Sequence, residues 1–471
     1  MLNSRPYFVG PDGLSFMSYL KPVLKPVWIA LLSGLLAQGL FLWPLGLNAE
    51  DLVQVTHEAQ SNAPLFQSYN ATMQAAQQGY YSAVGGLFPT IALSASGNAV
   101  DYSTTGYNGQ YLSSVAGVSL TQPIFNLNLW GVSLNQADTA DAARATYEAN
   151  IQSFYLLVST DYFNILQDQD VLVSDKAAVD FYQQTLKQTQ EKFQAGLSTI
   201  KDVKQAEANY DLSYATEIKD QSQLQIDISE LQKLTGKRLS NLASPSDSFP
   251  FKSPDPQDIN YWVTQAESNN KSLEAARFQA QAVKQTITEN IGNQLPQVDF
   301  IGTYGLTNTN ATNSVLANQF GGKTSANTWV VQLVATWSIF AGTTQFASTM
   351  QATHNYEAQT DTVLQTYRNI QAQTRQDYRS VLSDISKVSA LKQAVHADEL
   401  SLKQLDEEYK VGTETIVNVL DQANQLFADR KDYTRAEYQY MTDSLTLQED
   451  VGSLGLPQIT ALNQWLTSSK A

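Results

Sequence analysis

Cysteine is absent from the 471 residues, which excludes disulfide bonds, thiolate metal sites and the acylated N-terminal Cys of a lipoprotein. Histidine is scarce: His57, His354 and His396 lack the spacing of metal ligands, so we interpret them as surface or packing residues. Acidic residues outnumber basic ones by 45 to 29, giving a net charge of -16. Nucleic-acid binding requires clustered Lys and Arg, and no such cluster is visible. The composition therefore predicts no metal, no cofactor and no nucleic-acid partner.

Long hydrophobic runs are also missing, with one exception near the N-terminus. Residues 27–47 form an apolar run that follows Lys21 and Lys25 and precedes a small-residue cleavage pattern ending at Ala49. This arrangement predicts a secretory signal peptide over residues 1–49. A membrane-spanning helix is the alternative, because the run is long enough to cross a bilayer. Translation from Met17 would give a leader of more ordinary length.

The chain repeats itself with an offset of 216 residues. The segment EKFQAGLSTI at 191–200 aligns with EEYKVGTETI at 407–416. Further matches link Gln60-Ser-Asn62 to Glu267-Ser-Asn269, Phe88-Pro89 to Leu295-Pro296, Ile124-Phe125 to Ile339-Phe340, and Gly236 to Gly452. We therefore predict an internal duplication. The expected parts are a first repeat at 50–243, a proline-rich joint at 244–256, a second repeat at 257–452 and a C-terminal tail at 453–471.

Glycine and proline are missing from two long stretches, 132–195 and 343–411. Apolar residues recur there every seven positions, which is typical of coiled-coil helices. The first ladder is Ile151, Val158, Ile165, Leu172, Val179, Leu186 and Phe193, and the second is Tyr367, Thr374, Val381, Val388, Val395, Leu402 and Tyr409. Each stretch predicts a rod of roughly 95–105 Å at 1.5 Å per residue. With the return helices, we predict antiparallel hairpins over 132–235 and 343–451.

Four shorter segments alternate apolar with small or polar residues. They lie at about 91–100, 115–124, 298–307 and 329–339, and each has the length of a tilted strand across a bilayer. Four strands cannot close a barrel, and an open edge in lipid leaves backbone groups unpaired. Two chains would give eight strands, whose lumen side chains fill. Membrane-spanning strands therefore require several chains, and a pore requires a larger closed oligomer, with twelve strands from three chains or sixteen from four.

Four motifs carry a resemblance to a known family. They are EDLVQV at 50–55, TQPIF at 121–125, LQKLTG at 231–236 and GTETIVNVLD at 412–421. In this duplicated frame, the chain resembles the TolC family of outer-membrane efflux and secretion proteins over essentially all of 50–460. The resemblance implies an α+β fold: a long antiparallel coiled-coil tunnel in the periplasm, joined to a twelve-strand transmembrane β-barrel of a homotrimer.

The same resemblance implies a function and partners. The protein is expected to be a passive exit duct in the lipid of the outer membrane, and not an enzyme. A periplasmic adaptor and an inner-membrane pump of the RND or ABC type would open it for small-molecule efflux or type I secretion. The sequence leaves open whether the cargo is drugs, cations or protein.

The family's constriction ring matches Asp421 and Asn418, which lie three residues apart on one helix face. The name-giving member of the family carries Asp at both positions. Three carboxylates in a trimer, in place of six, would hold less negative potential and bind blocking cations more weakly.

The closing contacts of the family also match altered residues. Glu414 stands where an Arg is expected, and Lys201-Asp202 stands where that Arg finds its Thr-Asp partner. Our hypothesis is a latch of reversed polarity, Glu414 with Lys201, supported by a hydrogen bond from Tyr409. Adaptor docking in the family uses the helix turns, which match Gly196-Leu197 and Gly412-Thr413 here.

Two other protein classes compete with a channel. A soluble periplasmic coiled-coil adaptor without a pore would explain the hairpins, but it would need a lipoyl-like β-domain and would leave the strand pairs unexplained. An enzyme would need a nucleophile, a paired base or a His-x-x-x-His motif, and none is present in the sequence.

Overall fold

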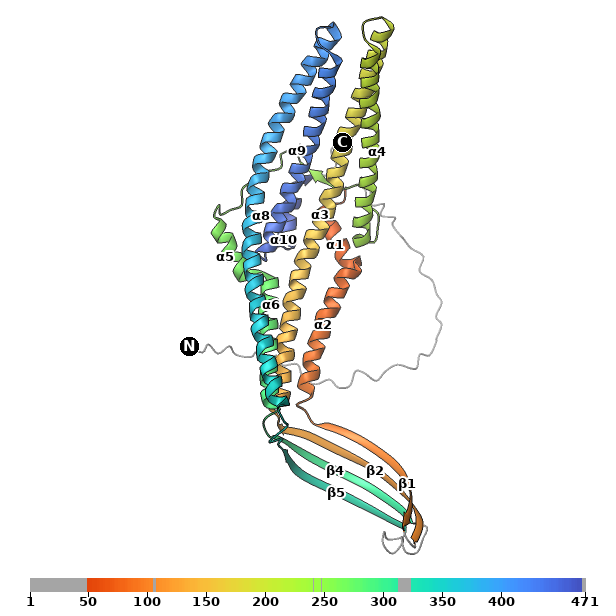
Figure 1. Ribbon diagram of the computed structural model, residues 1–471, viewed down its shortest axis with the longest axis vertical. Coiled ribbons are helices and arrows are strands. Elements are labelled where there is room, and N and C mark those ends of the chain that lie inside the picture. Colours follow the sequence, from red (N-terminus) through yellow and green to blue (C-terminus); the bar gives the residue numbers. More distant parts are fainter. Residues whose placement is uncertain (1–48, 105–106, 240, 247, 312–322, 468–471) are drawn as a thin grey trace, which may run out of the picture. The chain divides into compact units, whose positions relative to one another are not determined.

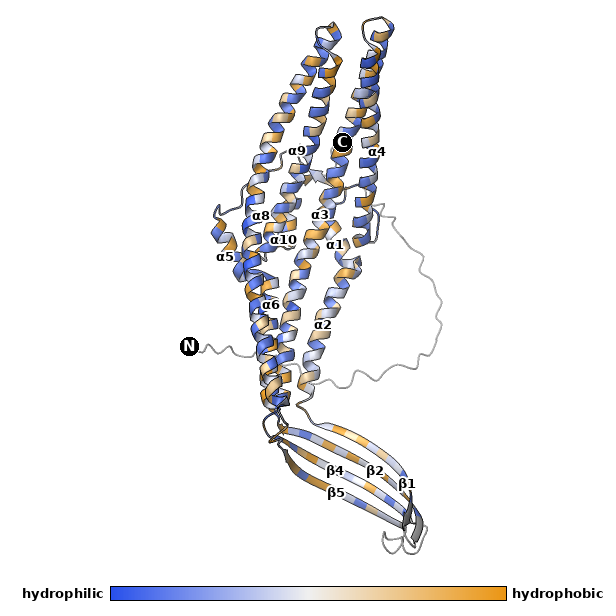
Figure 2. Cartoon of the chain, viewed as in Figure 1, coloured by the Kyte–Doolittle hydropathy of each residue, from blue (hydrophilic) through white to orange (hydrophobic). Residues whose placement is uncertain are grey.

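The computed structural model describes residues 49–104, 107–239, 241–246, 248–311 and 323–467. The predicted signal peptide lies outside these residues except for Ala49, and so does Met17. Among the helices described, none combines the length and the hydropathy needed to cross a membrane. Figure 2 shows the reason: hydrophobic residues are spread along the long helices and are not gathered in one segment.

The described chain contains the same series of elements twice (Figure 1). The first series is α1 (Leu52–Asn62), α2 (Pro64–Gly85), β1 (Thr90–Thr104), β2 (Tyr107–Phe125), α3 (Leu127–Gln194) and α4 (Ile200–Thr235). The second is α5 (Ile259–Asn269), α6 (Lys271–Gly292), β4 (Gln297–Ala311), β5 (Lys323–Thr336), α8 (Thr344–Val411) and α9 (Ile416–Asp450). Equivalent helices differ in length by at most one residue, with 68 residues in both α3 and α8, 36 in α4 and 35 in α9. The predicted internal duplication is confirmed.

Helix α3 begins five residues earlier than the glycine-free stretch suggested, because Gly131 lies inside it. The side chain of Asn126 caps this end by accepting a hydrogen bond from the Leu129 N–H at 3.2 Å. Gly131 does not break the helix but allows close packing: a Cβ there would lie 2.7 Å from the backbone nitrogen of Glu289 in α6. Gly292 of α6 approaches Asn128 in the same way. The glycines therefore bring α3 and α6 into direct backbone contact.

The four long strands form one antiparallel sheet in the order β1-β2-β4-β5 (Figure 1). They are 15, 19, 15 and 14 residues long and extend beyond the predicted strands at 91–100, 115–124, 298–307 and 329–339. Backbone pairing continues to Thr104 opposite Tyr107, because Ser, Thr, Asn and Gly can complete a ladder without apolar side chains. At the other end β5 stops at Thr336, short of the predicted residue 339. There the Trp337 indole N–H donates to the Gln294 carbonyl at 3.0 Å.

The central pairing of the sheet, β2 with β4, joins the two repeats. Its register shifts between Pro123 and Phe125, because proline has no N–H for the ladder. Strands β1 and β5 are the two edges, and in the described chain each has one neighbour only. One copy therefore presents two open sheet edges.

The joint and the C-terminal tail pack together beside α1. Strand β3 (Ser244–Pro245) pairs with β6 (Leu466–Thr467), and the tail also contains α10 (Leu456–Asn463). The Asn463 side chain accepts a hydrogen bond from the Leu52 N–H at 3.0 Å. The Tyr440 hydroxyl of α9 donates to the Lys252 carbonyl at 2.7 Å, which attaches the joint to the second hairpin. These contacts place both segments in the larger of two hydrophobic clusters.

The smaller cluster lies toward the hairpin turns. It contains Tyr182 of α3, Leu402 and Tyr409 of α8, and Leu420 and Phe427 of α9. Residues from both repeats therefore share one core near the turns, and this core positions the site.

Candidate channel entrance

The two hairpin turns have the same backbone geometry. Gly196 and Gly412 have φ values of 73° and 83°, in the left-handed region that favours glycine. In each turn the following N–H returns to the last helical turn: Leu197 N donates to the Lys192 carbonyl at 2.8 Å, and Thr413 N to the Glu408 carbonyl at 3.0 Å. Leu197 is 78% exposed and Thr413 is also exposed. The predicted docking residues therefore lie on the surface at the two turns.

Tyr409 joins the two hairpins below these turns. Its ring is 6% exposed, and its hydroxyl lies 3.2 Å from the Thr189 Oγ1 of α3. The Lys192 ammonium lies 3.5 Å from the centre of the Tyr409 ring and donates to the Tyr409 carbonyl at 2.5 Å. Burial lowers the pKa of the Lys192 ammonium below its usual value. The contact is therefore a hydrogen bond combined with a cation–π interaction.

Sequence reasoning identified Tyr409 but missed Thr189 and Lys192. Neither residue belongs to the seven-residue ladder of α3. The buried stripe near this turn runs instead through Ala178, Tyr182, Thr185 and Thr189, while the ladder residue Phe193 is exposed. Tyr182 and Thr189 are themselves seven residues apart and follow the ladder residues Val179 and Leu186 by three positions. A heptad buries two positions with this spacing, so a search for the second series would have indicated Thr189.

Glu414 uses its carboxylate locally. Its Oε1 accepts hydrogen bonds from the Thr415 N–H and from the Asn418 Nδ2, both at 2.7 Å. These two bonds lower the pKa of the Glu414 carboxyl, and the bond from the Thr415 N–H has the larger effect. Among the ion pairs of the described residues, none joins Glu414 to Lys201. Within one chain, the hypothetical latch is therefore not formed.

Asp202 completes the capping box at the start of α4, whose N-cap residue is Thr199. Its Oδ2 accepts from the Thr199 N–H at 2.9 Å, the Thr199 hydroxyl at 2.8 Å and the Ser198 hydroxyl at 3.1 Å. The bonds from Thr199 lower the pKa of the Asp202 carboxyl. Lys201, next to it, is exposed and directed away from the core that holds Val203.

The predicted ring residues Asn418 and Asp421 lie on the exposed face of α9, while Val419 and Leu420 between them are buried. One chain therefore carries a polar pair just behind the second turn, on the side away from the shared core. Asn418 is held by Glu414, so its amide has a fixed direction.

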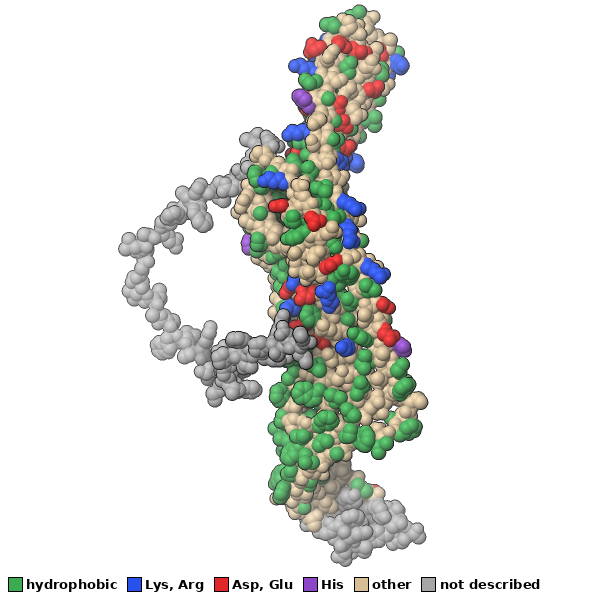
Figure 3. All heavy atoms as spheres, turned by 90° about the vertical axis from the view of Figure 1, so that its left-hand side faces the viewer, with side chains coloured by type: hydrophobic (Ala, Val, Ile, Leu, Met, Phe, Trp, Pro, Cys, Tyr) green, Lys and Arg blue, Asp and Glu red, His purple; other side chains and the backbone are tan. Residues whose placement is uncertain are grey.

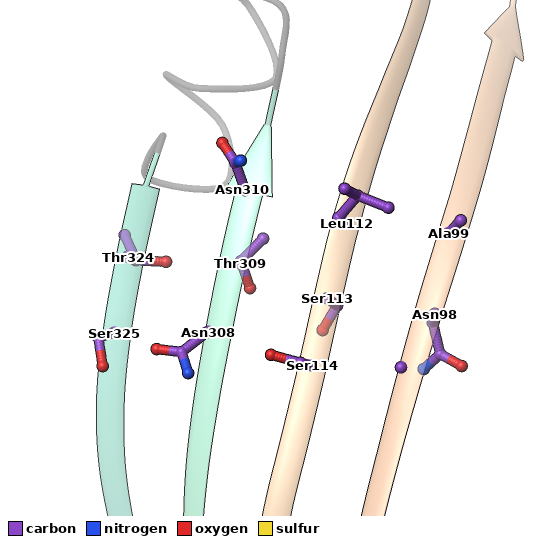
Figure 4. A pocket seen from close by; sticks show the side chains of 11 residues that line it. Asn98, Ala99, Leu112, Ser113, Ser114, Asn308, Thr309, Asn310, Thr324 and Ser325 are labelled. Atoms are coloured by element: carbon purple, nitrogen blue, oxygen red, sulfur yellow. The ribbon is translucent and has the colours of Figure 1, made fainter.

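Far from the turns, the sheet exposes many hydrophobic side chains and holds a cavity lined mainly by small and polar residues. Figure 3 shows charged side chains along the helices and hydrophobic ones gathered toward the sheet. Exposed hydrophobic residues of this end are Ile91, Leu93, Leu112, Trp329, Val331, Leu333, Trp337, Ile339 and Phe340. A cavity of about 580 Å³ lies among Asn98, Ser113, Asn308, Thr309 and Ser325 from all four strands (Figure 4). Its described lining contains no charged residue.

Residues 55–237 and 262–453 match the family model described as outer membrane efflux protein. The chain belongs to this family. The outer membrane protein TolC of Escherichia coli strain K12 is 29% identical over 427 residues, which are 89% of this chain and 85% of TolC. The alkaline protease secretion protein AprF of Pseudomonas aeruginosa is 23% identical over 398 residues, 82% of this chain and 81% of AprF. Among solved structures, CusC superposes with a TM-score of 0.74 at 18% identity, covering 86% of this chain and 92% of CusC.

Membership of this family confirms several predictions. The fold is the tunnel-plus-barrel fold, and the protein is located in the outer membrane with a periplasmic tunnel. It is an exit duct for efflux or type I secretion. The family and its solved neighbours are transport channels rather than enzymes, and none of these relatives favours the soluble adaptor.

Proposed function

We propose that three copies of this chain close one twelve-strand barrel and one helical tunnel. The observation that carries this proposal is the four-stranded sheet with two open edges and exposed apolar side chains. Unpaired backbone groups in lipid cost several kcal/mol each, so β1 of one copy has to pair with β5 of the next. The family resemblance favours three copies over four.

The absence of cysteine makes this pairing testable by cross-linking. A panel of variants with one Cys on β1 and one on β5 is oxidised in outer membranes and separated on denaturing gels. A covalent series that stops at three chains supports the trimer, and a series that reaches four contradicts it. A matched control is Val118→Cys with Tyr304→Cys, which are opposite each other within one chain and should give only single chains.

The periplasmic end is the gate in this proposal. Each copy would contribute Asp421 and Asn418 to a ring at the narrowest point of the tunnel. The exposure of both side chains on one face of α9 supports this role. A ring of three carboxylates attracts cations and slows anions.

Two contacts would hold the gate closed. The first is the Tyr409–Thr189–Lys192 contact, which joins the hairpins within one chain. The second is an ion pair between Glu414 of one copy and Lys201 of the neighbouring copy. Both side chains are accessible at the turns, which supports a contact across the interface. Such an exposed pair would be weak, so that a docking partner could break it.

The partners in this proposal are a periplasmic adaptor and an inner-membrane pump. The adaptor would contact the turns at Gly196-Leu197 and Gly412-Thr413, where an exposed Leu197 offers an apolar contact. Site-specific photo-cross-linking from position 197, compared with position 291 near the sheet, tests this contact. Capture of a membrane-fusion type adaptor from position 197 only would support the proposal, and equal capture from both positions would contradict it.

A further inference from the structure

Two pairs of aspartates face each other across the hairpins at equivalent places in the two repeats. The Asp168 carboxyl of α3 faces the Asp227 carboxyl of α4, and the Asp384 carboxyl of α8 faces the Asp443 carboxyl of α9, each within reach of a shared hydrogen bond. The two pairs are related by the same 216-residue offset as the repeats. Each pair lies about 44 Å from its hairpin turn, at 1.5 Å per residue. They therefore mark one level of the helical region, far from the gate.

The surroundings of these pairs do not suit two ionised carboxylates. The Asp384 residue is 9% exposed, and the Oδ2 atoms of Asp168 and Asp384 are buried without a hydrogen-bond partner among the described residues. Two negative charges in contact away from water repel each other, and neither can donate a hydrogen bond. One proton placed between them removes the repulsion and supplies the missing donor.

The charged groups around the Asp384 pair are few. Asp443 faces Asp384 from α9, and the charge of Lys387 of α8 also acts on Asp384. The Oδ1 atom of Asp443 accepts from the Gln439 amide at 2.6 Å. Burial, as the larger cause, and the neighbouring Asp443 together raise the pKa of Asp384 to about 7.

The Asp168 pair has similar surroundings. Asp227 and Asp220 face it from α4, and Arg435 acts on it from α9. Burial, as the larger cause, and the neighbouring Asp227 together raise the pKa of Asp168 to about 7. Among the ion pairs of the described residues, none includes a member of either pair. In the same residues, no group of three or more acidic or histidine side chains could hold a metal ion.

The first hairpin contains an internal control one heptad nearer the turn. There Asp175 of α3 and Asp220 of α4 also approach each other, but the Lys431 ammonium of α9 bridges them, 3.1 Å from the Asp220 Oδ2. A cation thus neutralises this acid pair. Among the described residues, no cation bridges the pairs at Asp168 and Asp384 in this way.

We propose that Asp168–Asp227 and Asp384–Asp443 are proton-binding sites, each holding one proton shared between two carboxyl groups, which fastens the two helices of its hairpin together. The closed hairpin then binds more protons than a locally opened one, whose aspartates titrate near 3.8. Its stability is therefore highest below that pH and falls as the pH rises toward 7. The sites act at mid-height, and the proposal does not depend on the trimer or on the gate.

The test measures hydrogen exchange of the purified full-length protein by mass spectrometry between pH 5 and 9, corrected for the intrinsic rate. In the wild type, opening of the segments around 384 and 443 should increase by up to about tenfold per pH unit between the two pKa values. Asp384→Asn keeps the shape and donates a hydrogen bond at every pH, so its profile around residues 384 and 443 should be less steep than that of the wild type, and its exchange should be slower at pH 8. Identical profiles in the two proteins would overturn the proposal.

Two further comparisons keep the result unambiguous. Two other acid contacts in the second hairpin, Asp377–Asp450 and Asp398–Asp429, stay intact in Asp384→Asn, so any residual slope belongs to them. Asp168→Asn should flatten the profile of the first hairpin only. Should Asp384→Asn fail to fold, the test measures the infrared C=O band of protonated carboxyl groups and compares the wild type with Asp443→Asn. A band that disappears between pH 5 and 9 and is weaker in Asp443→Asn supports the shared proton, and a band unaffected by either change refutes it.

Discussion

The two hairpins have the same backbone at their turns but use equivalent side chains differently. Asp202 and Asn418 occupy the same position of the repeat, three residues after the capping Thr199 and Thr415. In the first hairpin the carboxylate completes a capping box, whereas in the second the amide donates to Glu414. The positive φ of the glycine and the capping threonine are therefore what each turn requires. The third residue of each return helix, Asp202 in α4 and Asn418 in α9, can therefore differ between the repeats without changing the turn.

A second difference between the hairpins lies in the last helical turn of α3 and of α8, just before the hairpin turns. Phe193 and Tyr409 are also equivalent, but Phe193 is 42% exposed and Tyr409 is 6% exposed. Tyr409 is covered because it contacts α3 of the first hairpin, and Phe193 has no such cover within the chain. The duplication therefore produces two unequal hairpins, of which the second is inserted into the core near the turns.

The largest expected effect concerns the charge bridge from Lys431 of the second hairpin to Asp175 and Asp220 of the first. Lys431→Met leaves Asp175 and Asp220 facing each other without a cation, which should destabilise the region by about 3–5 kcal/mol at pH 8. The loss should be smaller at pH 5, because a proton can then replace the lysine. Hydrogen exchange of α4 and α9 measures both values.

The matched control is Lys431→Met with Asp175→Asn, which removes the repulsion together with the bridge. It should recover much of the lost stability at pH 8. A Lys431→Met protein as protected as the wild type at both pH values would show that the bridge contributes nothing.

The next effect tests the unequal burial of the two aromatic residues. Tyr409→Ala removes a buried ring and should cost about 3 kcal/mol of local stability, whereas Phe193→Ala should cost less than about 1 kcal/mol. Tyr409→Ala should also raise the closed-state conductance in planar lipid bilayers, because the hairpins lose their link. Equal losses in the two variants would show that both rings are covered in the assembled protein.

Much of the helical part follows from the sequence because its rules are local. The breaker-free stretches, the turn glycines and the offset of 216 residues predicted both hairpins to within a few residues, apart from the early start of α3. The strand lengths did not follow, because backbone ladders extend through polar residues such as Ser103 and Asn308 that show no apolar alternation.

The site was predicted only in part. The sequence predicted Gly196 and Gly412 as turn residues, and both have the positive φ that a turn between two helices requires. Thr189 and Lys192 were missed because their role depends on a helix from the other repeat. A long-range contact of this kind leaves no local pattern in the sequence.

A smaller effect is expected from exchanging the side chains at the compared position of the repeat. Asn418→Asp restores a second carboxylate beside Asp421 and removes the amide that Glu414 binds. Block by divalent cations in planar bilayers should become about tenfold stronger, since a larger ring charge concentrates cations locally. Asp421→Asn should weaken the block by a similar factor. A block unchanged in both variants would place this face of α9 away from the lumen.

The smallest effect is expected at the exposed pair that would link neighbouring copies. Glu414→Ala and Lys201→Ala should each raise the closed-state conductance slightly, and the double variant should add little, because both changes break the same contact. The exchange Glu414→Lys with Lys201→Glu tests polarity, since it should return the conductance toward wild type. Single variants with unchanged conductance would show that Glu414 serves only its local bonds to Thr415 and Asn418. The two turns would then differ in capping alone.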